Sequence, residues 1–439
     1  CLYDNVKPVS SVDTISPYWN ITGSVNLTAT ANDVTSGLKN VTLWYRYSSD
    51  NSSWDGWVEN ITDADYTWNW TFTFPNGTGY YEFYSIASDN ASNTEDAPGS
   101  ADTSCAFDNV KPSISFDTPP TPANNSKGNL DWAQVNVTVS DAVSNNISSF
   151  IDWNQSLVGY WNFEYTNSTY VFDNSSYQNN GSFNGTNFGE SNITIGKYGN
   201  SLEFDGNDDF VNLSNHASVL NLSTGTLEVW FKTSTSSEQY VFGAGDSTND
   251  WMAVSVGEFT GSYADESFTF TISQGGSNRI YALVRHGHSY YCDGNWHHAV
   301  IVVGSNYNKV YIDGNKESPT YGAGDSSTGN YFLNPNNLDA MGIGRRFYPN
   351  SPYYFNGMID EVRLWNRTLA HEEINASYNS KVNSLYHNFT GLSDGNYTYY
   401  AHAIDTAGNE NTTETRTLTI DTTKPSISFD TPPTPANNA

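Results

Sequence analysis

The stretch KPSISFDTPPTPANN occupies residues 111–125, and the same 15 residues return unchanged at 424–438. Directly before the first copy the chain reads DNVKP at 108–112, which repeats DNVKP at 4–8. The DNVKP copies start 104 residues apart (108 − 4), and the longer copies start 313 residues apart (424 − 111). Self-similarity of this kind predicts an array of like units. The second unit holds 209 residues more than the first (313 − 104).

The flanks of the repeat show where the extra residues enter. The segments VNLTATAND from Val25 and VNVTVSD from Val135 alternate apolar and polar residues, as half-buried strands do. A second shared pattern closes both units, as Tyr81, Tyr84, Ala87, Asp89, Ala91 and Asn93 and again as Tyr397, Tyr400, Ala403, Asp405, Ala407 and Asn409. The insertion therefore lies between about Trp153 and Leu385, in a loop of the second unit, because loop tips accept whole domains. We expect Trp153 and Leu385 to lie close together in space.

The composition favours an all-β protein. A chain of 439 residues has room for about three domains. Aromatic residues make up 15% and charged residues 15%, which suits short aromatic-rich strands with a surface of Asn, Ser and Thr. The net charge of −29 disfavours nucleic-acid binding, which needs basic patches, while a halophilic origin stays open. No apolar run approaches the roughly 20 residues that span a bilayer, so we expect any leader or anchor outside this sequence.

Two resemblances refine this prediction. The closing pattern Y-x-x-Y-x-x-A-x-D-x-A-x-N, followed by a Lys-Pro boundary, resembles the Ig-like or fibronectin type III-like modules of bacterial and archaeal surface proteins. Within the insertion, five phrases resemble, in order, the laminin-G-like or concanavalin-like jelly-roll family: VGYWNFE at 158, SLEFDGNDDFV at 201, DGNWHHAVIV at 293, VYIDG at 310 and FNGMIDEVRLWNRTLAHEEI at 355. The resemblances imply an all-β fold of tandem Ig-like β-sandwiches with an inserted laminin-G-like jelly roll.

These resemblances also imply the domain boundaries. We expect a first sandwich over residues 1–107 and a second sandwich split between 108–156 and 384–421. The jelly roll is expected over 157–383, and the start of a further unit over 422–439.

A metal site is implied by the second resemblance. Members of that family are usually adhesive or glycan-contacting, and some bind Ca²⁺ at the rim of the sandwich. Carried over by position, the candidate ligands are Glu164, Asp173, Asn179 and Asp360, which offer the oxygen donors that Ca²⁺ prefers. The alternative is turn chemistry, because Asp and Asn in turns commonly bond their own backbone. Calcium is the metal cofactor to be tested.

The histidines, carboxylates and cysteines of the insertion form no recognisable catalytic motif. His297 and His298 are adjacent in a predicted strand, so they point to opposite faces, cannot share one metal and are expected to pack around Trp296. A glycosidase needs two carboxylates about 5–10 Å apart across one cleft, and the strand spacing that would place them is missing. Cys292 lies in no nucleophile motif and is expected to be buried. We expect no enzymatic activity and no catalytic residue.

The cysteines offer no disulfide framework either. Cys1 and Cys105 hold matching places before the two DNVKP copies. This match favours an internal repeat position for Cys1 over the lipid-modified first residue of a processed lipoprotein.

Glycosylation signals are dense. The chain holds about 24 Asn-x-Ser/Thr triplets, although a composition rich in Asn, Ser and Thr creates part of them by chance. None lies between Asn221 and Asn366, which predicts a glycan-poor face that packs on a neighbour or meets a ligand. We expect N-linked glycans more often on the sandwiches, as at Asn26, Asn40, Asn60, Asn69 and Asn136, than near the jelly-roll core. The other predicted acceptors are Asn20, Asn51, Asn76, Asn90, Asn146, Asn167, Asn192, Asn212, Asn221, Asn366, Asn375, Asn388, Asn396 and Asn411.

Together these features predict a structural and adhesive protein of an archaeal or related prokaryotic cell surface, filament or sheath. It would be extracellular, heavily glycosylated, and in contact with further copies, neighbouring repeat units or environmental glycans. One alternative is a lectin whose jelly roll binds carbohydrate. Another is a secreted polysaccharide-degrading enzyme whose catalytic domain lies outside this sequence.

The last residues discriminate between these alternatives. Residues 426–431 repeat an apolar strand, and an unpaired strand with Ile427 and Phe429 needs a partner from further chain or from a neighbouring molecule. The same stretch lying free in solvent would instead favour a self-contained lectin.

Overall fold

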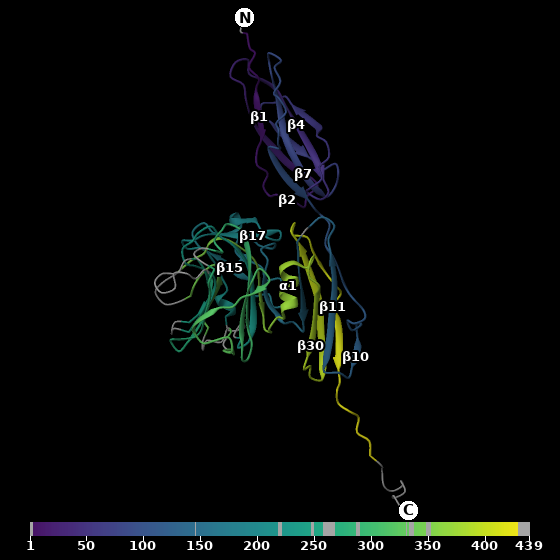
Figure 1. The fold of residues 1–439 in the computed structure, drawn as a ribbon, viewed down its shortest axis with the longest axis vertical. Coiled ribbons are helices and arrows are strands. Elements are labelled where there is room, and N and C mark those ends of the chain that lie inside the picture. Colours follow the sequence, from purple (N-terminus) through teal and green to yellow (C-terminus); the bar gives the residue numbers. More distant parts are fainter. Residues whose placement is uncertain are drawn as a thin grey trace, which may run out of the picture.

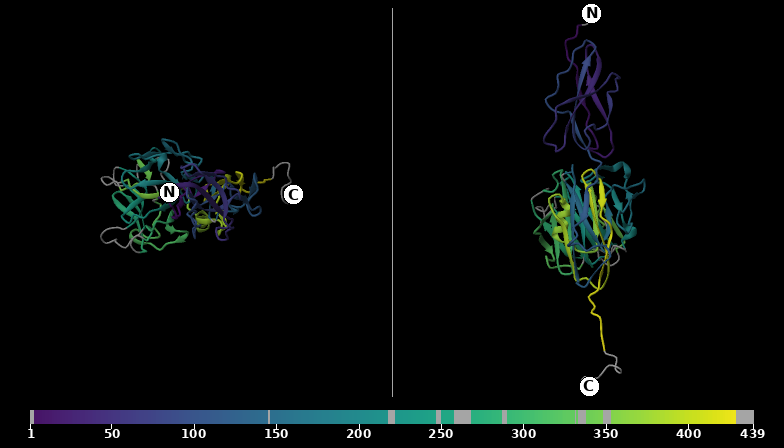
Figure 2. Two further views of the ribbon diagram at one scale, coloured as in Figure 1. Left: turned by 90° about the horizontal axis from the view of Figure 1, so that it is seen from above. Right: turned by 90° about the vertical axis from the view of Figure 1, so that its right-hand side faces the viewer.

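The computed structural model of the chain describes residues 3–144, 146–217, 222–246, 250–257, 268–286, 290–330, 332, 338–347 and 353–428. A slender sandwich at the N-terminal end stands on a wider body, in which the jelly roll and the second sandwich lie side by side (Figures 1 and 2). The fold is all-β as predicted, and α1 (His371–Asn379) is the one α-helix in the described ranges. In those ranges, no helix combines the length and the apolar character needed to cross a membrane.

The first sandwich packs a three-stranded sheet on a five-stranded sheet. The small sheet has the order β1 (Val9–Val12), β3 (Val25–Asn32) and β6 (Asn69–Phe72). The larger sheet has the order β2 (Trp19–Asn20), β8 (Thr103–Phe107), β7 (Gly79–Asp89), β4 (Leu38–Ser48) and β5 (Val58–Asp63). Burial alternates along β3, where Leu27 and Ala29 face the core and Thr28 faces solvent. The two faces meet around Phe72, whose ring centroid lies 4.9 Å from that of Phe83.

The second sandwich is assembled from strands on both sides of the insertion. One sheet has the order β30 (Leu385–Thr390), β11 (Trp132–Ser140) and β9 (Ser113–Phe116). The other has the order β10 (Ser126–Gly128), β33 (Arg416–Ile420), β31 (Gly395–Asp405) and β12 (Ile147–Trp153), with β32 (Glu410–Thr412) also on β31. The Trp153 and Phe389 ring centroids lie 4.1 Å apart, and Leu385 belongs to the same core. The two ends of the insertion therefore lie close together, as the repeat arithmetic predicts.

The jelly roll between them is built from two larger sheets around one apolar core. The first sheet has the order β16 (Ile193–Ile195), β17 (Asn200–Asp205), β29 (Asn356–Trp365), β19 (Gly225–Lys232), β24 (Trp296–Val303), β25 (Asn308–Ile312) and β26 (Asn315–Lys316), with β13 (Leu157–Trp161) also on β29. The second sheet has the order β14 (Tyr170–Val171), β15 (Gly181–Asn184), β18 (Phe210–Asn212), β28 (Ala340–Ile343), β20 (Gln239–Gly245), β21 (Trp251–Val256), β22 (Phe268–Gln274), β23 (Ser277–Val284) and β27 (Thr320–Ala323).

Jelly roll and second sandwich share a buried seam. Phe150 of β12 packs edge-on against Tyr160 and Trp365 of the jelly roll, with ring centroids 5.6 and 5.4 Å away. Helix α1 lies in this seam (Figure 1), and its Ile374 belongs to the same apolar cluster. The inserted domain therefore packs directly against the second sandwich through a shared apolar cluster, in addition to its two chain connections.

The described C-terminal residues leave the sandwich. Residues 421–428 form no strand in the described chain, and the side chains of Thr422 and Thr423 donate hydrogen bonds to Asp394. Ile427 is 99% exposed. Residues 421–423 thus still contact the second sandwich and residues 424–428 are exposed, while Phe429 and residues 430–431 of the predicted strand lie outside the described residues.

Candidate functional site

Two of the predicted metal ligands, Asp173 and Asn179, lie together beside β13. The Asp173 carboxylate accepts hydrogen bonds from the backbone N–H groups of Tyr160 (2.7 Å), Ser175 (2.8 Å) and Asn179 (2.7 Å), and from the Ser175 hydroxyl (2.8 Å). The Asn179 amide donates to the Val158 carbonyl at 2.8 Å. Both side chains therefore hold the loop after β14 against β13, which is the turn chemistry that the sequence left as the alternative.

The other two predicted ligands, Glu164 and Asp360, hold the turn between β16 and β17. Glu164 accepts hydrogen bonds from the backbone N–H and from the side-chain amide of Asn200. Asp360 accepts from the N–H groups of Lys197 (2.8 Å) and Tyr198 (3.0 Å). In the described residues, no group of three acidic side chains that could share one ion includes Glu164, Asp173 or Asp360. Calcium at these four positions stays a prediction, while the hydrogen bonds give each residue a structural role.

The histidines and cysteines are placed inside the jelly roll and the first sandwich. His297 bonds Asp313 (2.9 Å) and Asp293 (3.2 Å), whereas His298 is buried on the other face and stacks on Trp230 with ring centroids 4.9 Å apart. The opposite faces agree with the prediction, and Trp296 packs against the same cluster as the Trp230 ring on which His298 stacks. Cys105 and Cys292 are free and buried, and burial raises the pKa of Cys292 to about 11. Neither thiol has the character of a nucleophile, and Cys1 lies outside the described residues.

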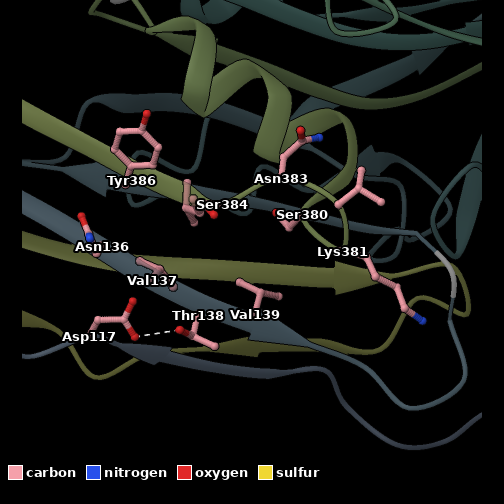
Figure 3. Close-up of a pocket in the computed structure, with 12 residues that line it drawn as sticks. Asp117, Asn136, Val137, Thr138, Val139, Ser380, Lys381, Asn383, Ser384 and Tyr386 are labelled. Carbon is pink, nitrogen blue, oxygen red and sulfur yellow. Dashed lines mark hydrogen bonds between the residues drawn. The ribbon is translucent and has the colours of Figure 1, made fainter.

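Three of the grooves on the described surface differ in how close they lie to a glycosylation signal. The first has a volume of about 290 Å³ and lies on the second sandwich, between β11 and the turn after α1 (Figure 3). The Thr138 hydroxyl donates to Asp117 at 2.7 Å along its floor, and Asn136 lies at one end. Because Asn136 is a predicted glycan acceptor, a sugar attached there would occupy this groove.

The second groove, of about 560 Å³, follows the seam between jelly roll and second sandwich. Tyr160, Tyr165, Tyr400 and His402 contribute its aromatic lining. Asn411, another predicted acceptor, lies in its wall, where its amide donates to the Pro112 carbonyl at 2.9 Å. This groove also lies beside a glycosylation signal.

The third groove, of about 370 Å³, is lined only by jelly-roll residues. None of these residues is part of a glycosylation signal. It is lined by the turn after β17, the segment before β20 and the start of β29, through Asp205, Gly206, Asn207, Thr235, Ser237, Glu238, Gln239, Tyr353, Tyr354 and Asn356. We call it the jelly-roll groove. Most of its lining falls in the stretch from 222 to 365 that carries no signal.

Hydrogen bonds fix the floor of the jelly-roll groove. The Asn356 amide donates to the Asp205 carbonyl at 2.7 Å, its side-chain oxygen accepts from the Thr235 hydroxyl at 2.9 Å, and its backbone N–H donates to the Gln239 side chain at 2.8 Å. Gly206 sits in the turn with φ of +80°, and a Cβ there would come within 2.9 Å of the Asn356 side chain. Asn356 therefore ties three separate segments into one preformed surface.

An aromatic edge closes the groove on one side. Tyr353 is 39% exposed, and the Arg346 guanidinium lies over its ring at 5.6 Å from the centroid. Arg346 also donates to the Tyr240 hydroxyl at 3.2 Å, and that hydroxyl donates to Glu238 at 2.5 Å. The Tyr353 ring is thus held in place by the Arg346 guanidinium and by the neighbouring Tyr240 ring.

The groove offers mostly acceptor oxygens. Asp205 is exposed and accepts two bonds from Asn207, at 2.8 and 2.9 Å, which leaves further lone pairs open. Partial burial acts to raise the pKa of Asp205, but the hydrogen bonds from Asn207, from the Asp208 backbone and from the Asp209 side chain together lower that pKa. An ionised carboxylate beside an exposed ring suits a neutral polyhydroxylated ligand, whose hydroxyl groups donate and whose C–H face stacks.

Sequence reasoning missed this groove because its parts are far apart in the chain. The phrase SLEFDGNDDFV did contain Asp205 and Asn207, but as a family motif and not as a site. One available signal was the long stretch without glycosylation triplets, which does contain Glu238, Gln239 and Tyr353.

The predicted glycan acceptors fall into two groups by exposure. Most are exposed or half-buried, and the exposed ones include Asn26, Asn51, Asn60, Asn69, Asn76, Asn90, Asn167, Asn366, Asn388 and Asn396. Asn20 is the exception, since it is 7% exposed and its amide donates to the Pro17 carbonyl at 3.4 Å. A sugar on Asn20 would require this amide to leave its buried position, and glycosylation there stays a prediction. Asn221 lies outside the described residues.

Comparison with solved structures found several chains with low similarity to this one. The chain is similar to domain 4 of a GH43 extracellular arabinanase from Geobacillus stearothermophilus in complex with arabinotriose, at 16% identity and a TM-score of 0.37, covering 51% of this chain and 98% of that one. It is also similar to a sialidase CBM40 from Ruminococcus gnavus bound to alpha2,3 sialyllactose, at 14% identity and a TM-score of 0.33, covering 40% and 95%. A Trypanosoma rangeli sialidase in complex with the inhibitor DANA is 16% identical with a TM-score of 0.34, covering 51% of this chain and 33% of that one.

A comparison with curated proteins found no match. Residues 205–375 match the family described as the concanavalin A-like lectin/glucanases superfamily. This span includes β17 to β29 in part or whole and every residue that lines the jelly-roll groove. The chain therefore carries a concanavalin A-like jelly-roll domain over residues 205–375, as its sequence motifs predict.

Proposed function

We propose that the chain is a non-enzymatic extracellular binding protein whose jelly roll holds a carbohydrate in the jelly-roll groove. One observation carries the proposal: an exposed tyrosine, Tyr353, borders a preformed polar floor on the only one of the three grooves described above that has no glycosylation signal beside it. The name of the matched family, which includes lectins, supports the choice of ligand class.

The absence of hydrolysis is part of the proposal. A glycosidase keeps one carboxyl group protonated to act as general acid, which requires a raised pKa. In the groove, the hydrogen bonds from Asn207 lower the pKa of Asp205 and favour its ionised form. Glu238 is engaged by the Tyr240 hydroxyl at 2.5 Å. Both carboxylates are therefore suited to accept hydrogen bonds from sugar hydroxyls.

A glycan array followed by calorimetry tests this function. The whole chain is applied to immobilised oligosaccharides, and the sugar with the strongest signal is titrated in solution. We expect Tyr353→Ala and Asn207→Ala each to weaken binding by about 10-fold, the effect of roughly 1.4 kcal/mol from one lost stacking or hydrogen-bonding contact. Tyr386→Ala is the matched control, because Tyr386 is 42% exposed but lies on the second sandwich.

Two outcomes would contradict the proposal. One is the lack of any sugar signal on the array, and the other is equal weakening by Tyr386→Ala and Tyr353→Ala. Release of reducing sugar from the bound oligosaccharide would contradict its non-enzymatic part.

A structural role as an adhesive repeat protein of a prokaryotic cell surface is the second candidate. The first sandwich and the segment that follows β33 lie at opposite ends of the molecule (Figures 1 and 2), which suits an array of units. Glycopeptide mass spectrometry of native material tests the extracellular location: sugar on exposed Asn26, Asn60 and Asn69 supports it, and bare sandwiches count against it. Self-association of the whole chain, measured by light scattering, would favour this candidate over an isolated lectin.

A further inference from the structure

The same three aspartates meet at one end of each sandwich. In the first sandwich they are Asp4, Asp33 and Asp89, and in the second they are Asp108, Asp141 and Asp405. In each set, one carboxylate oxygen of every member lies within 4.8 Å of one from each other member. The three positions come from the DNVKP segment, from the residue after β3 or β11, and from the end of β7 or β31.

Hydrogen bonds hold both sets in the same way. One oxygen of Asp108 accepts from the Val110 N–H at 3.0 Å, as one oxygen of Asp4 accepts from the Val6 N–H at 3.0 Å. Asp141 accepts from the N–H groups of the turn that follows it, at 2.9 and 2.6 Å. Asp33 does the same through three N–H groups, at 3.2, 2.8 and 2.6 Å.

The third aspartate of each set is held by an asparagine four residues later. Asn409 donates to Asp405 through its backbone N–H and its side-chain amide, both at 3.0 Å, and to the Asp108 carbonyl at 3.1 Å. Asn93 donates to Asp89 at 2.8 and 2.7 Å and to the Asp4 carbonyl at 3.3 Å. Both carboxylate oxygens of Asp89 and Asp405 therefore accept a hydrogen bond from the asparagine, whereas the backbone N–H groups engage only one oxygen of each of the other four aspartates.

The remaining oxygens lack a partner. Asp108 is fully buried, and its Oδ2 makes no hydrogen bond within the described structure. The same holds for one buried oxygen each of Asp141, Asp4 and Asp33. None of the six aspartates pairs with a lysine or arginine among the described residues. Three carboxylates gathered this closely, with a buried oxygen unsatisfied, need positive charge among them, which either a proton or a bound cation can supply.

We propose that Asp108, Asp141 and Asp405 bind one divalent cation, and that Asp4, Asp33 and Asp89 bind a second. Three carboxylates offer hard oxygen donors in mono- or bidentate geometry, and Ca²⁺ takes six to eight such ligands in a flexible shell, so Ca²⁺ fits better than the strictly octahedral Mg²⁺. These sites are distinct from the four jelly-roll positions that the sequence pointed to.

The site formed by Asp108, Asp141 and Asp405 lies at the junction between the sandwiches. Asp108 directly follows β8, the last strand of the first sandwich, and its N–H donates to the Asn20 carbonyl of that sandwich at 2.9 Å. The turn after Asp141 contacts the first sandwich through Val143, whose carbonyl accepts from the Tyr80 hydroxyl at 3.3 Å. A cation held by Asp108, Asp141 and Asp405 therefore ties the connecting segment to the second sandwich at the point where the first one packs.

Calcium titration of the chelator-treated whole chain by calorimetry tests both sites. We expect two Ca²⁺ per chain, with Mg²⁺ at least 10-fold weaker. Asp108→Asn and Asp4→Asn should each remove one equivalent, and the double variant should remove both. Asp65→Asn is the control, because Asp65 is exposed and outside both sets.

Folding of each variant is checked without calcium by circular dichroism, and Asp4→Asn, at the less buried site, keeps the test open if Asp108→Asn does not fold. Loss of one equivalent in Asp4→Asn with the control unchanged supports the proposal. Lack of calcium binding by the wild type, or an unchanged stoichiometry in the double variant, overturns it.

Discussion

Glu164 shows what burial does to one carboxyl group of this protein. Burial raises its pKa from 4.5 to about 8; hydrogen bonds from Asn200 oppose that rise, and the charges of Glu361 and Glu410 add to it. The folded protein then keeps a proton that the unfolded chain releases, so the free energy of unfolding should fall as pH rises from about 4.5 to about 8.

Glu164→Gln should reduce this fall, because glutamine carries no titrating group. Urea unfolding at pH 5 and pH 8 measures the difference for wild type and variant. Glu203→Gln, on an exposed position of β17, is the control and should keep the wild-type fall. The same pH dependence in Glu164→Gln as in wild type would contradict the assignment.

Asp173 explains why single residues were harder to predict than the fold. Its loop, DNSSYQNNG, predicts oxygen ligands and turn caps equally well from sequence. The structure shows four hydrogen bonds on Asp173, but they depend on β13 passing beside the loop, and that neighbour is set by tertiary packing. By contrast, Asp89 and Asp405 were identified as repeat positions, and only their meeting with Asp4 and Asp108 was missed.

At the scale of elements, Arg363 of β29 connects the inserted jelly roll to its host. Its guanidinium donates to Ser148 of β12 at 2.9 Å and to Ser377 of α1 at 2.6 Å, and it pairs with the buried Glu361. Arg363→Met would leave Glu361 buried without its partner. We expect the free energy of unfolding to drop by about 3–5 kcal/mol, the usual cost of an uncompensated buried charge.

Arg46→Met provides the comparison for that prediction. Arg46 pairs with Glu82 on the first sandwich at 2.5 Å, but both side chains are partly exposed, so we expect a loss of about 1 kcal/mol or less. Chemical unfolding of both variants measures the difference. Equal losses would mean that the Arg363 network does not hold the seam.

The elements themselves were largely predictable, and the physical reason is the repeat. Because the first unit is uninterrupted, the spacing of its strands shows where the insertion enters the second unit. The strands on the two sides of the insertion are then expected to pair, as β11 does with β30 and β12 with β31. The seam was not predictable, since Phe150 faces Trp365 only once the jelly roll is seated on the sandwich. The jelly-roll groove escaped prediction for the same reason, as Asn356 joins segments more than 100 residues apart.

At the scale of the whole molecule, the junction of the first sandwich with the rest buries fewer apolar side chains than the seam between the jelly roll and the second sandwich. The first sandwich meets the rest through a small cluster in which Tyr80, Ala106 and Val143 are buried. The jelly roll and the second sandwich share the larger cluster around Phe150 and Trp365, a second one around Tyr198, Trp230 and Ile404, and the Arg363 network. Buried apolar area and paired buried charges couple the unfolding of neighbouring bodies, whereas small contacts leave them independent.

Differential scanning calorimetry of the whole chain should therefore show two transitions, one for the first sandwich and one for the jelly roll together with its host. Arg363→Met should lower the temperature of the second transition by several degrees and leave the first unchanged, because its partners Ser148 and Ser377 lie in the seam. Arg46→Met, in the first sandwich, should act on the first transition alone. Separate melting of the jelly roll and the second sandwich would show that the seam does not couple them, and the insertion would then be an independent domain carried on two closely spaced ends.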